Sequence, residues 1–331
     1  MYDNYIAVDW AQSNMAIARL TKSSKKANVI DMPASIKELK SYLKQVRGSK
    51  ILTVEETTTA QWLYVELREC VDEIIICDPY RNKLLSEGAK NDKIDAIKLA
   101  TLLQAGLLKP VFHSSDYLIG LRKLMSAYDD LIQRGVRLKN QRSSILRSLG
   151  LDKKEKTTDN LPDQFVLDRI DTAILAYEED RAKYVEEFSK HLKSSKTLQR
   201  IKEVPGIGVI GAVKIGSIIV DAKRFKHKNN FLAYCGLVNL SCDSGGRTYR
   251  VKAPRYNRQI KSVFKTAALS TIRGKGCFAK LYENLITVKR YPDHQARHAV
   301  ARKIAIAVFG TMYSNTKFNP QKIGALKALS E

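Results

Sequence analysis

Four carboxylates in the first hundred residues have the types and spacing of a divalent-metal site. Asp9 lies near the end of one apolar stretch and Glu55 at the end of another, while Asp92 and Asp95 stand three apart and would share one helix face. Carboxylate oxygens are the ligands that Mg²⁺ prefers, and a pair of Mg²⁺ ions about 3.5–4 Å apart activates phosphodiesters. The alternative is ordinary surface acids, which are favourable at a helix N-terminus. As a set, the four predict a Mg²⁺ site.

A second group with chemical potential is Ser244, which two glycines and then Arg247 follow. A serine beside two glycines sits on accessible backbone, and nearby cations would hold a phosphate, as attack on phosphorus requires. An ordinary loop serine is the alternative, and Ser241, which no glycine pair follows, is the weaker candidate nucleophile. The basic side chains expected to bind nucleic acid here are Arg247, Arg250, Lys252 and Arg255.

The carboxylates need a sheet to bring them together. Apolar patterns predict the order β-β-β-α-β-α-β-α, which is that of a ribonuclease-H-like fold. In such a sheet the first and fourth strands are neighbours, so Asp9 and Glu55 would approach each other beside the helix of Asp92 and Asp95. The predicted strands cover residues 5–10, 15–20, 29–33, 51–56 and 73–79, and the helices cover 36–46, 60–70 and 92–106.

The rest of the chain is predicted to be mainly helical. Residues 115–200 have apolar residues at helical spacing on both sides of a polar break at 152–163, which indicates a helical hairpin or coiled coil. The glycines of Val-Pro-Gly-Ile-Gly at 204–208 suit either backbone approach to a phosphate or a plain helix–helix turn. We expect three domains: a metal domain at 1–112, a helical linker at 113–198 and a basic domain at 199–331.

The charge of the chain points to a polyanionic partner. The 57 Lys and Arg residues outnumber 34 Asp and Glu, giving a formal net charge of +23, and nucleic acid is the simplest partner for such a protein. No apolar run is long enough to span a membrane, and the N-terminus does not have the pattern of a signal peptide. The five cysteines form no CxxC pair, so we expect a cytoplasmic protein without disulfides or zinc.

One further set of residues could bind a metal. His294 and His298 are four apart and Asp293 adjoins them, but no third strong ligand stands out. A structural or phosphate-facing role is the preferred interpretation.

The stretches AVDWA, VEETTTAQWL, CDPYRNK and KNDKIDA together resemble the N-terminal domain of the DEDD transposases of the insertion-sequence 110 family, which is similar to the resolvase RuvC. The segment FLAYCGLVNLSCDSGGRTYR resembles the second conserved block of that family. The resemblance implies that Asp9, Glu55, Asp92 and Asp95 hold Mg²⁺ and that Ser244 is the nucleophile. Where the family often has Glu-Ala-Thr-Gly, this chain has Glu55-Glu56-Thr-Thr, so Glu56 remains the alternative ligand. Strand alternation allows only one of the two to reach the metals.

The resemblance therefore implies a transposase or site-specific recombinase that breaks and rejoins double-stranded DNA through a covalent phosphoserine. It also implies a structured guide RNA from the element and a homodimer or homotetramer. The alternative function is a RuvC-like junction nuclease, which would hydrolyse DNA with metals and water and would not need Ser244.

Overall fold

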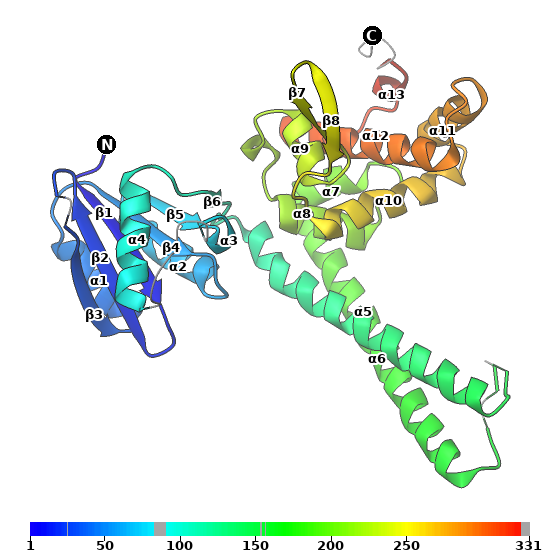
Figure 1. Cartoon of the computed structure of the whole chain (residues 1–331). Coiled ribbons are helices and arrows are strands. Elements are labelled where there is room, and N and C mark those ends of the chain that lie inside the picture. The colour runs from blue at the N-terminus through cyan, green and yellow to red at the C-terminus, as the bar shows by residue number, and fades with distance from the viewer. Residues whose placement is uncertain (25, 83–90, 153, 156, 326–331) are drawn as a thin grey trace. The chain divides into compact units, whose positions relative to one another are not determined.

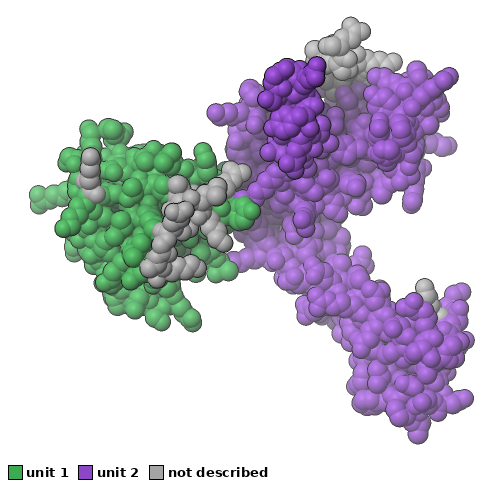
Figure 2. Space-filling view, in the orientation of Figure 1, with its two compact units in different colours: residues 1–115 green, residues 116–331 purple. Residues whose placement is uncertain are grey.

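The computed structural model describes residues 1–24, 26–82, 91–152, 154–155 and 157–325. The chain is a mixture of a six-stranded α/β sheet and many helices, and it divides into two compact units, residues 1–115 and residues 116–331 (Figure 2). Within the described residues, no helix is both long enough and apolar enough to cross a membrane. The division into three domains remains a prediction.

The first unit is built on one sheet in the order β3-β2-β1-β4-β5-β6 (Figure 1). The antiparallel meander β1 (Asn4–Trp10), β2 (Asn14–Thr21) and β3 (Asn28–Pro33) is followed by β4 (Lys50–Glu55) and β5 (Glu73–Cys77), which run parallel to β1. The predicted strands and their order are confirmed. The short antiparallel edge strand β6 (Pro110–Val111) was not predicted, because two residues carry no readable alternation.

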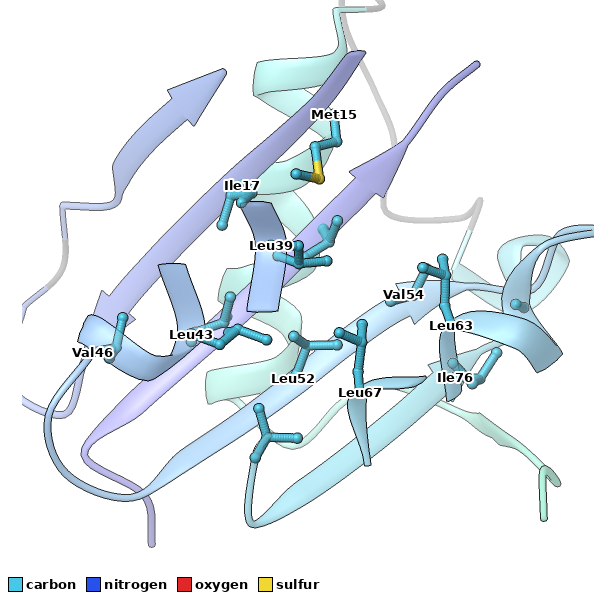
Figure 3. Packing of buried hydrophobic residues seen from close by; sticks show 14 residues of the cluster. Met15, Ile17, Leu39, Leu43, Val46, Leu52, Val54, Leu63, Leu67 and Ile76 are labelled. Carbon is cyan, nitrogen blue, oxygen red and sulfur yellow. The ribbon is translucent and has the colours of Figure 1, made fainter. Parts of the chain in front are cut away.

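Helices cover both faces of this sheet. On one face, α1 (Ile36–Gln45) and α2 (Ala60–Leu67) pack on a core that includes Val8. Leu52 and Val54 of the same core are labelled in Figure 3. On the other face, α4 (Asp92–Gln104) packs through Ala96, Leu99, Ala100 and Leu103 on Tyr5, Ala7 and Ile51. A single turn, α3 (Pro79–Asn82), follows β5. The two cores use alternate residues of the same strands, so they fix which face each strand-end side chain occupies.

The second unit begins with the predicted pair of long helices, α5 (Tyr117–Ser148) and α6 (Leu161–Ser194) (Figure 1). The two helices pack antiparallel, and Gly135 leaves room for the ring of Tyr177, because a Cβ there would lie 2.3 Å from a ring atom. Arg142 on α5 binds Asp171 on α6 at 2.5 Å. The hairpin is therefore held by a close ring contact and an ion pair as well as by apolar residues.

The remainder of the second unit is a helical core with one hairpin of strands. The helices are α7 (Lys196–Lys202), α8 (Val209–Ile219), the short 3₁₀ turn η2 (Ala222–Arg224), α9 (Lys228–Tyr234), α10 (Arg258–Ile272), α11 (Cys277–Thr287), α12 (Asp293–Ser314) and α13 (Gln321–Ala325). Between α9 and α10, β7 (Leu240–Ser244) pairs antiparallel with β8 (Arg247–Lys252). The sequence predicted a loop at this place, because exposed strands lack apolar alternation.

The turn between α7 and α8 is packed against α10. Gly206 has a φ of +86°, and a Cβ at this position would lie 2.6 Å from the carbonyl oxygen of Ala267. This contact favours the plain helix–helix turn over a phosphate contact at this glycine, because the face of Gly206 that lacks a side chain is covered by α10.

Gly206→Ala is expected to lower the free energy of unfolding by about 1–3 kcal/mol, since it combines strain at positive φ with overpacking against backbone. Gly211→Ala is the matched control, because its Cβ would meet side chains at an ordinary 3.5 Å inside α8. That substitution should raise the free energy of unfolding by about 0.5–1 kcal/mol. Urea titration of both variants gives the comparison, and equal stability of the two would contradict the packing argument.

Candidate active site

The side chains of Asp9 and Glu55 lie on the same face of the sheet. Val8 of β1 pairs in parallel register with Val54 of β4, and both valines belong to the core beneath α1 and α2. Asp9 and Glu55 follow those valines by one residue, so they lie on the opposite face, in line with Ala7 of the α4-side core. The register thus places the two carboxylates on neighbouring strands on the side of the sheet that α4 covers.

The first turn of α4 supplies the other two carboxylates. Asn91 caps the helix, with its side chain accepting a hydrogen bond from the backbone N–H of Lys93, so that Asp92 and Asp95 both fall in the first turn. Asp92 is exposed and Asp95 is partly buried. On a helix, Asp92 precedes Ala96 by four residues and Asp95 precedes Leu99 by four, and both of those residues are buried against the sheet. The acids therefore continue the sheet-facing stripe of α4 beyond its apolar part.

The four carboxylates act on one another electrostatically. Burial raises the pKa of Asp9, and the negative charges of Asp92 and Asp95 raise it further. Burial likewise raises the pKa of Glu55, with added contributions from Asp9 and Asp95. Such mutual repulsion in a half-buried site is typical of a place that a cation would stabilise.

The donor set suits Mg²⁺ because it consists of carboxylate oxygens alone. In the described part of the chain, however, no three His, Cys, Asp or Glu side chains form a ready-made metal cluster. Lys98, one turn along α4, approaches Asp95 at 3.9 Å and partly offsets its charge. The arrangement is thus four interacting carboxylates that a bound ion would have to draw closer together.

Asp9→Asn is expected to raise the melting temperature of the chain in EDTA by about 2–5 °C at neutral pH. The raised pKa means that the folded state favours the protonated acid. The stability that Asp9 contributes is therefore complete below its ordinary pKa and is lost as the pH rises through the raised value. The gain from the amide should accordingly shrink on acidification, as calorimetry from pH 7 towards pH 4 would measure.

Asp3→Asn is the control of opposite sign in the same unit. The backbone N–H and hydroxyl of Ser49 donate hydrogen bonds to Asp3 and hold its pKa below the usual range, so losing that charge should lower the melting temperature. If both amide variants shift the melting temperature in the same direction, the electrostatic account of Asp9 is wrong.

Glu56 lies in a different environment from Glu55. Its carboxylate lies 2.5 Å from Nε2 of His113, whose side chain is only 3% exposed. Nδ1 of His113 lies 2.7 Å from the side-chain oxygen of Gln61, and the amide nitrogen of Gln61 donates to the carbonyl of Ser114. The motif around Glu55 did not point to His113, because this histidine meets Glu56 only through the fold. Glu56 is thus held by a buried partner, while Glu55 interacts with Asp9 and Asp95.

Ser244 lies at the tip of the β7–β8 hairpin. It pairs with Arg247 across the two-residue turn of Gly245 and Gly246, whose φ values of +57° and +75° are those that glycine adopts most readily. Ser244 is exposed, and its hydroxyl has no hydrogen-bond partner among the described residues. In contrast, the hydroxyl of Ser241 donates to Asp243 at 3.1 Å. Both candidate serines are exposed, and Ser244 is the one whose hydroxyl is not engaged by another described side chain.

The predicted nucleic-acid-binding residues surround this tip and the strand behind it. Arg247, Arg250 and Lys252 lie on β8, and Arg255 follows in the segment before α10. All four are exposed. Both strands of the hairpin are largely exposed, with Tyr249 and Val251 open to solvent, so this element has almost no core of its own. A two-stranded hairpin of this kind is marginal alone, which suits a surface that a partner covers.

The comparisons with known proteins fall on these same two regions. A DEDD transposase model of the IS110 type matches residues 6–150, which hold the four carboxylates, and a model of the transposase IS116/IS110/IS902 family matches residues 198–283, which hold Ser244 and the four basic residues.

Two curated relatives are transposases of insertion sequences. The chain is 22% identical over 211 residues to the "Transposase for insertion sequence element IS1328" of Yersinia enterocolitica, covering 60% of this chain and 63% of that protein. It is also 22% identical over 188 residues to the "Transposase for insertion sequence element IS1111A" of Coxiella burnetii, covering 52% of each chain. The alignments thus span less than two thirds of either relative. With two family models matched in order along the chain, the protein belongs to the IS110-type DEDD transposase family.

Proposed function

We propose that the chain is a DNA transposase or site-specific recombinase that breaks and rejoins double-stranded DNA at the ends of its element and at a target. The observation that carries the proposal is the gathering of Asp9, Glu55 and the first turn of α4 on one face of a sheet, where burial and the neighbouring acids raise the pKa of Asp9 and of Glu55. The strand order supports a ribonuclease-H-like, RuvC-like metal domain.

In this proposal Asp9, Glu55, Asp92 and Asp95 hold a pair of Mg²⁺ ions. When bound, the ions would polarise a DNA phosphate and stabilise the leaving oxygen. Glu55 is the preferred ligand over Glu56, because Glu56 is occupied by His113. The strand ends and the capped helix would fix the backbone of the four acids, so that their side chains would have to turn towards the ions.

Ser244 is proposed as the nucleophile. Its Oγ would form a bond to phosphorus as the bond from phosphorus to the 3′ oxygen breaks, and that oxygen would leave as a 3′ hydroxyl after taking a proton. Arg247 and Arg250 would bind the phosphate from the neighbouring strand, as guanidinium groups do well. The reverse reaction, by a new 3′ hydroxyl, would rejoin the strands and release the serine. An element-derived guide RNA and a homodimer or homotetramer belong to the proposal through the family resemblance.

Denaturing electrophoresis tests the proposal directly. Purified protein is incubated with end-labelled element DNA and RNA from the same element, with either Mg²⁺ or EDTA. A DNA band shifted by the mass of the protein, formed only with Mg²⁺ and removed by protease, is the expected result. Cleavage without that band would support the hydrolytic nuclease instead, and neither cleavage nor a shifted band under conditions that support transposition in cells would overturn both.

A further inference from the structure

The second unit contains a cavity of about 680 Å³ that the catalytic proposal does not use. Its walls come from α10, α12, the segment between α11 and α12, and Asn239, the residue just before β7. A volume of this size is in the range of small-molecule pockets and exceeds what a single phosphate needs. The lining residues that carry the argument are Lys265, Leu269, Tyr291, His298 and Arg302.

The cavity is strongly cationic. Lys265 has no ion-pair partner among the described residues, and Arg302 contributes a second charge. Burial, followed by the charges of Arg302, Lys261 and Lys265, lowers the pKa of His298, so the surroundings resist a further positive charge. Asp293 does not balance them, because both its oxygens are bound by Arg297 and one also by the hydroxyl of Tyr282. An anion is the ligand that this field favours.

One wall is suited to a flat, uncharged group. Tyr291 is 41% exposed and Leu269 is 42% exposed, so the cavity has an aromatic ring and an aliphatic side chain open to a ligand. The backbone holds Tyr291 in place, because its N–H donates to the carbonyl of Leu285 at 2.9 Å and Arg290 before it adopts a left-handed φ of +51°. Cations beside an accessible ring are the means by which proteins hold single-stranded nucleic acid.

We propose that this cavity binds one unstacked nucleotide of a single strand, with the phosphate against Lys265 and Arg302 and the base against Tyr291 and Leu269. The proposal rests on the function proposed above for its premise that the partner is nucleic acid. His294 and His298 then line a nucleotide site, and no metal cluster includes them in the part of the chain that the structure describes.

The cavity is linked to the candidate nucleophile by the chain itself. Asn239 lines the cavity and precedes β7, and Ser244 is the last of the five residues of that strand. A strand rises about 3.3 Å per residue, so the base and tip of the hairpin lie about 16 Å apart. A nucleic-acid strand bound in the cavity would therefore lie about one hairpin length from Ser244. The single-stranded segment could come from DNA opened for exchange or from the guide RNA, which share this chemistry.

Fluorescence anisotropy with labelled five-nucleotide strands, without Mg²⁺, tests the proposal. Tyr291→Leu is expected to weaken binding about 5- to 100-fold, which is the usual range for loss of one base stack, while Tyr291→Phe keeps the wild-type affinity. Lys265→Gln should lower the slope of log affinity against log salt by about one, since one phosphate contact is lost. Lys123→Gln, which removes an exposed charge on α5, is the control and should leave the affinity for these short strands unchanged.

A strand with an abasic site at each position in turn gives the second readout. At one position, loss of the base should lower the affinity of the strand for the wild-type protein, whereas the Tyr291→Leu variant should bind the abasic and intact strands equally. A tighter complex with the RNA strand would assign the site to the guide, and a tighter complex with the DNA strand would assign it to opened DNA. Equal affinities of the wild type and Tyr291→Leu for every strand would overturn the proposal. Since no cleavage is measured, that failure would leave the catalytic proposal standing.

Discussion

Glu55→Gln is expected to reduce Mg²⁺-dependent DNA cleavage by more than about 100-fold, because it removes a charged oxygen that would bind the metal directly. Loss of a residue that only hydrogen-bonds to a metal ligand already lowers metal affinity or activity by about 10- to 100-fold. Glu56→Gln, one residue later, should retain cleavage within about 10-fold of wild type, since it lies outside the metal-ligand set and the amide still bonds to His113. Both substitutions remove one negative charge at the end of the same strand, so they form a matched pair. The measurement is single-turnover cleavage of element DNA over a range of Mg²⁺ concentrations.

Calorimetric titration with Mg²⁺ separates the two roles without relying on activity. Glu55→Gln should weaken the binding of Mg²⁺, whereas Glu56→Gln should bind Mg²⁺ as wild type does and instead melt at a lower temperature. The lower temperature follows from the weaker bond between an amide and the buried ring of His113. Loss of Mg²⁺ binding in Glu56→Gln, with Glu55→Gln unaffected, would exchange the two assignments. Equal effects of the two substitutions on Mg²⁺ binding would contradict the assignment of Glu55 and Glu56 to opposite faces of the sheet.

Ser244→Ala is expected to abolish the covalent protein–DNA band and to lower strand cleavage by at least about 1,000-fold, because a covalent mechanism has no substitute for its attacking oxygen. Ser241→Ala is the matched control on the same strand. Its hydroxyl is already bound to Asp243, so its removal should leave the covalent band within a few-fold of wild type. Denaturing electrophoresis of both variants with labelled DNA measures the difference.

The fold of the hairpin should survive Ser244→Ala, because the serine is exposed and the turn is formed by Gly245 and Gly246. Unchanged circular dichroism and unchanged Mg²⁺ binding would verify this. Wild-type cleavage by Ser244→Ala would sink the nucleophile and favour hydrolysis by water. Loss of the band in Ser241→Ala alone would move the role to that residue.

Much of the first unit could be predicted from local pattern. Each strand of the meander and the parallel pair is a short apolar run that ends at a polar turn, and such signals are read within a few residues. The positions of Asp9 and Glu55 at strand ends, and the three-residue spacing of Asp92 and Asp95, follow from the sequence in the same way.

The tertiary structure decided what depends on contacts between distant segments. The distinction between Glu55 and Glu56 comes from His113, which follows Glu56 by 57 residues and meets it only in the folded chain. The packing of Gly206 on α10 likewise joins residues far apart in the chain. The β7–β8 hairpin has exposed side chains on both faces, so no alternation marked it.

By itself, then, the sequence determined where the strands and helices of the first unit lie along the chain, the spacing of the four acids and the glycine pair after Ser244, because each is written in local spacing. Only the tertiary structure decided which glutamate is bound by a buried histidine and which serine hydroxyl is already bonded to a neighbouring side chain. It alone formed the cationic cavity by bringing α10 and α12 together around Tyr291. The physical reason is that periodicity records which face a residue takes, whereas its partners depend on chain segments that meet only after folding.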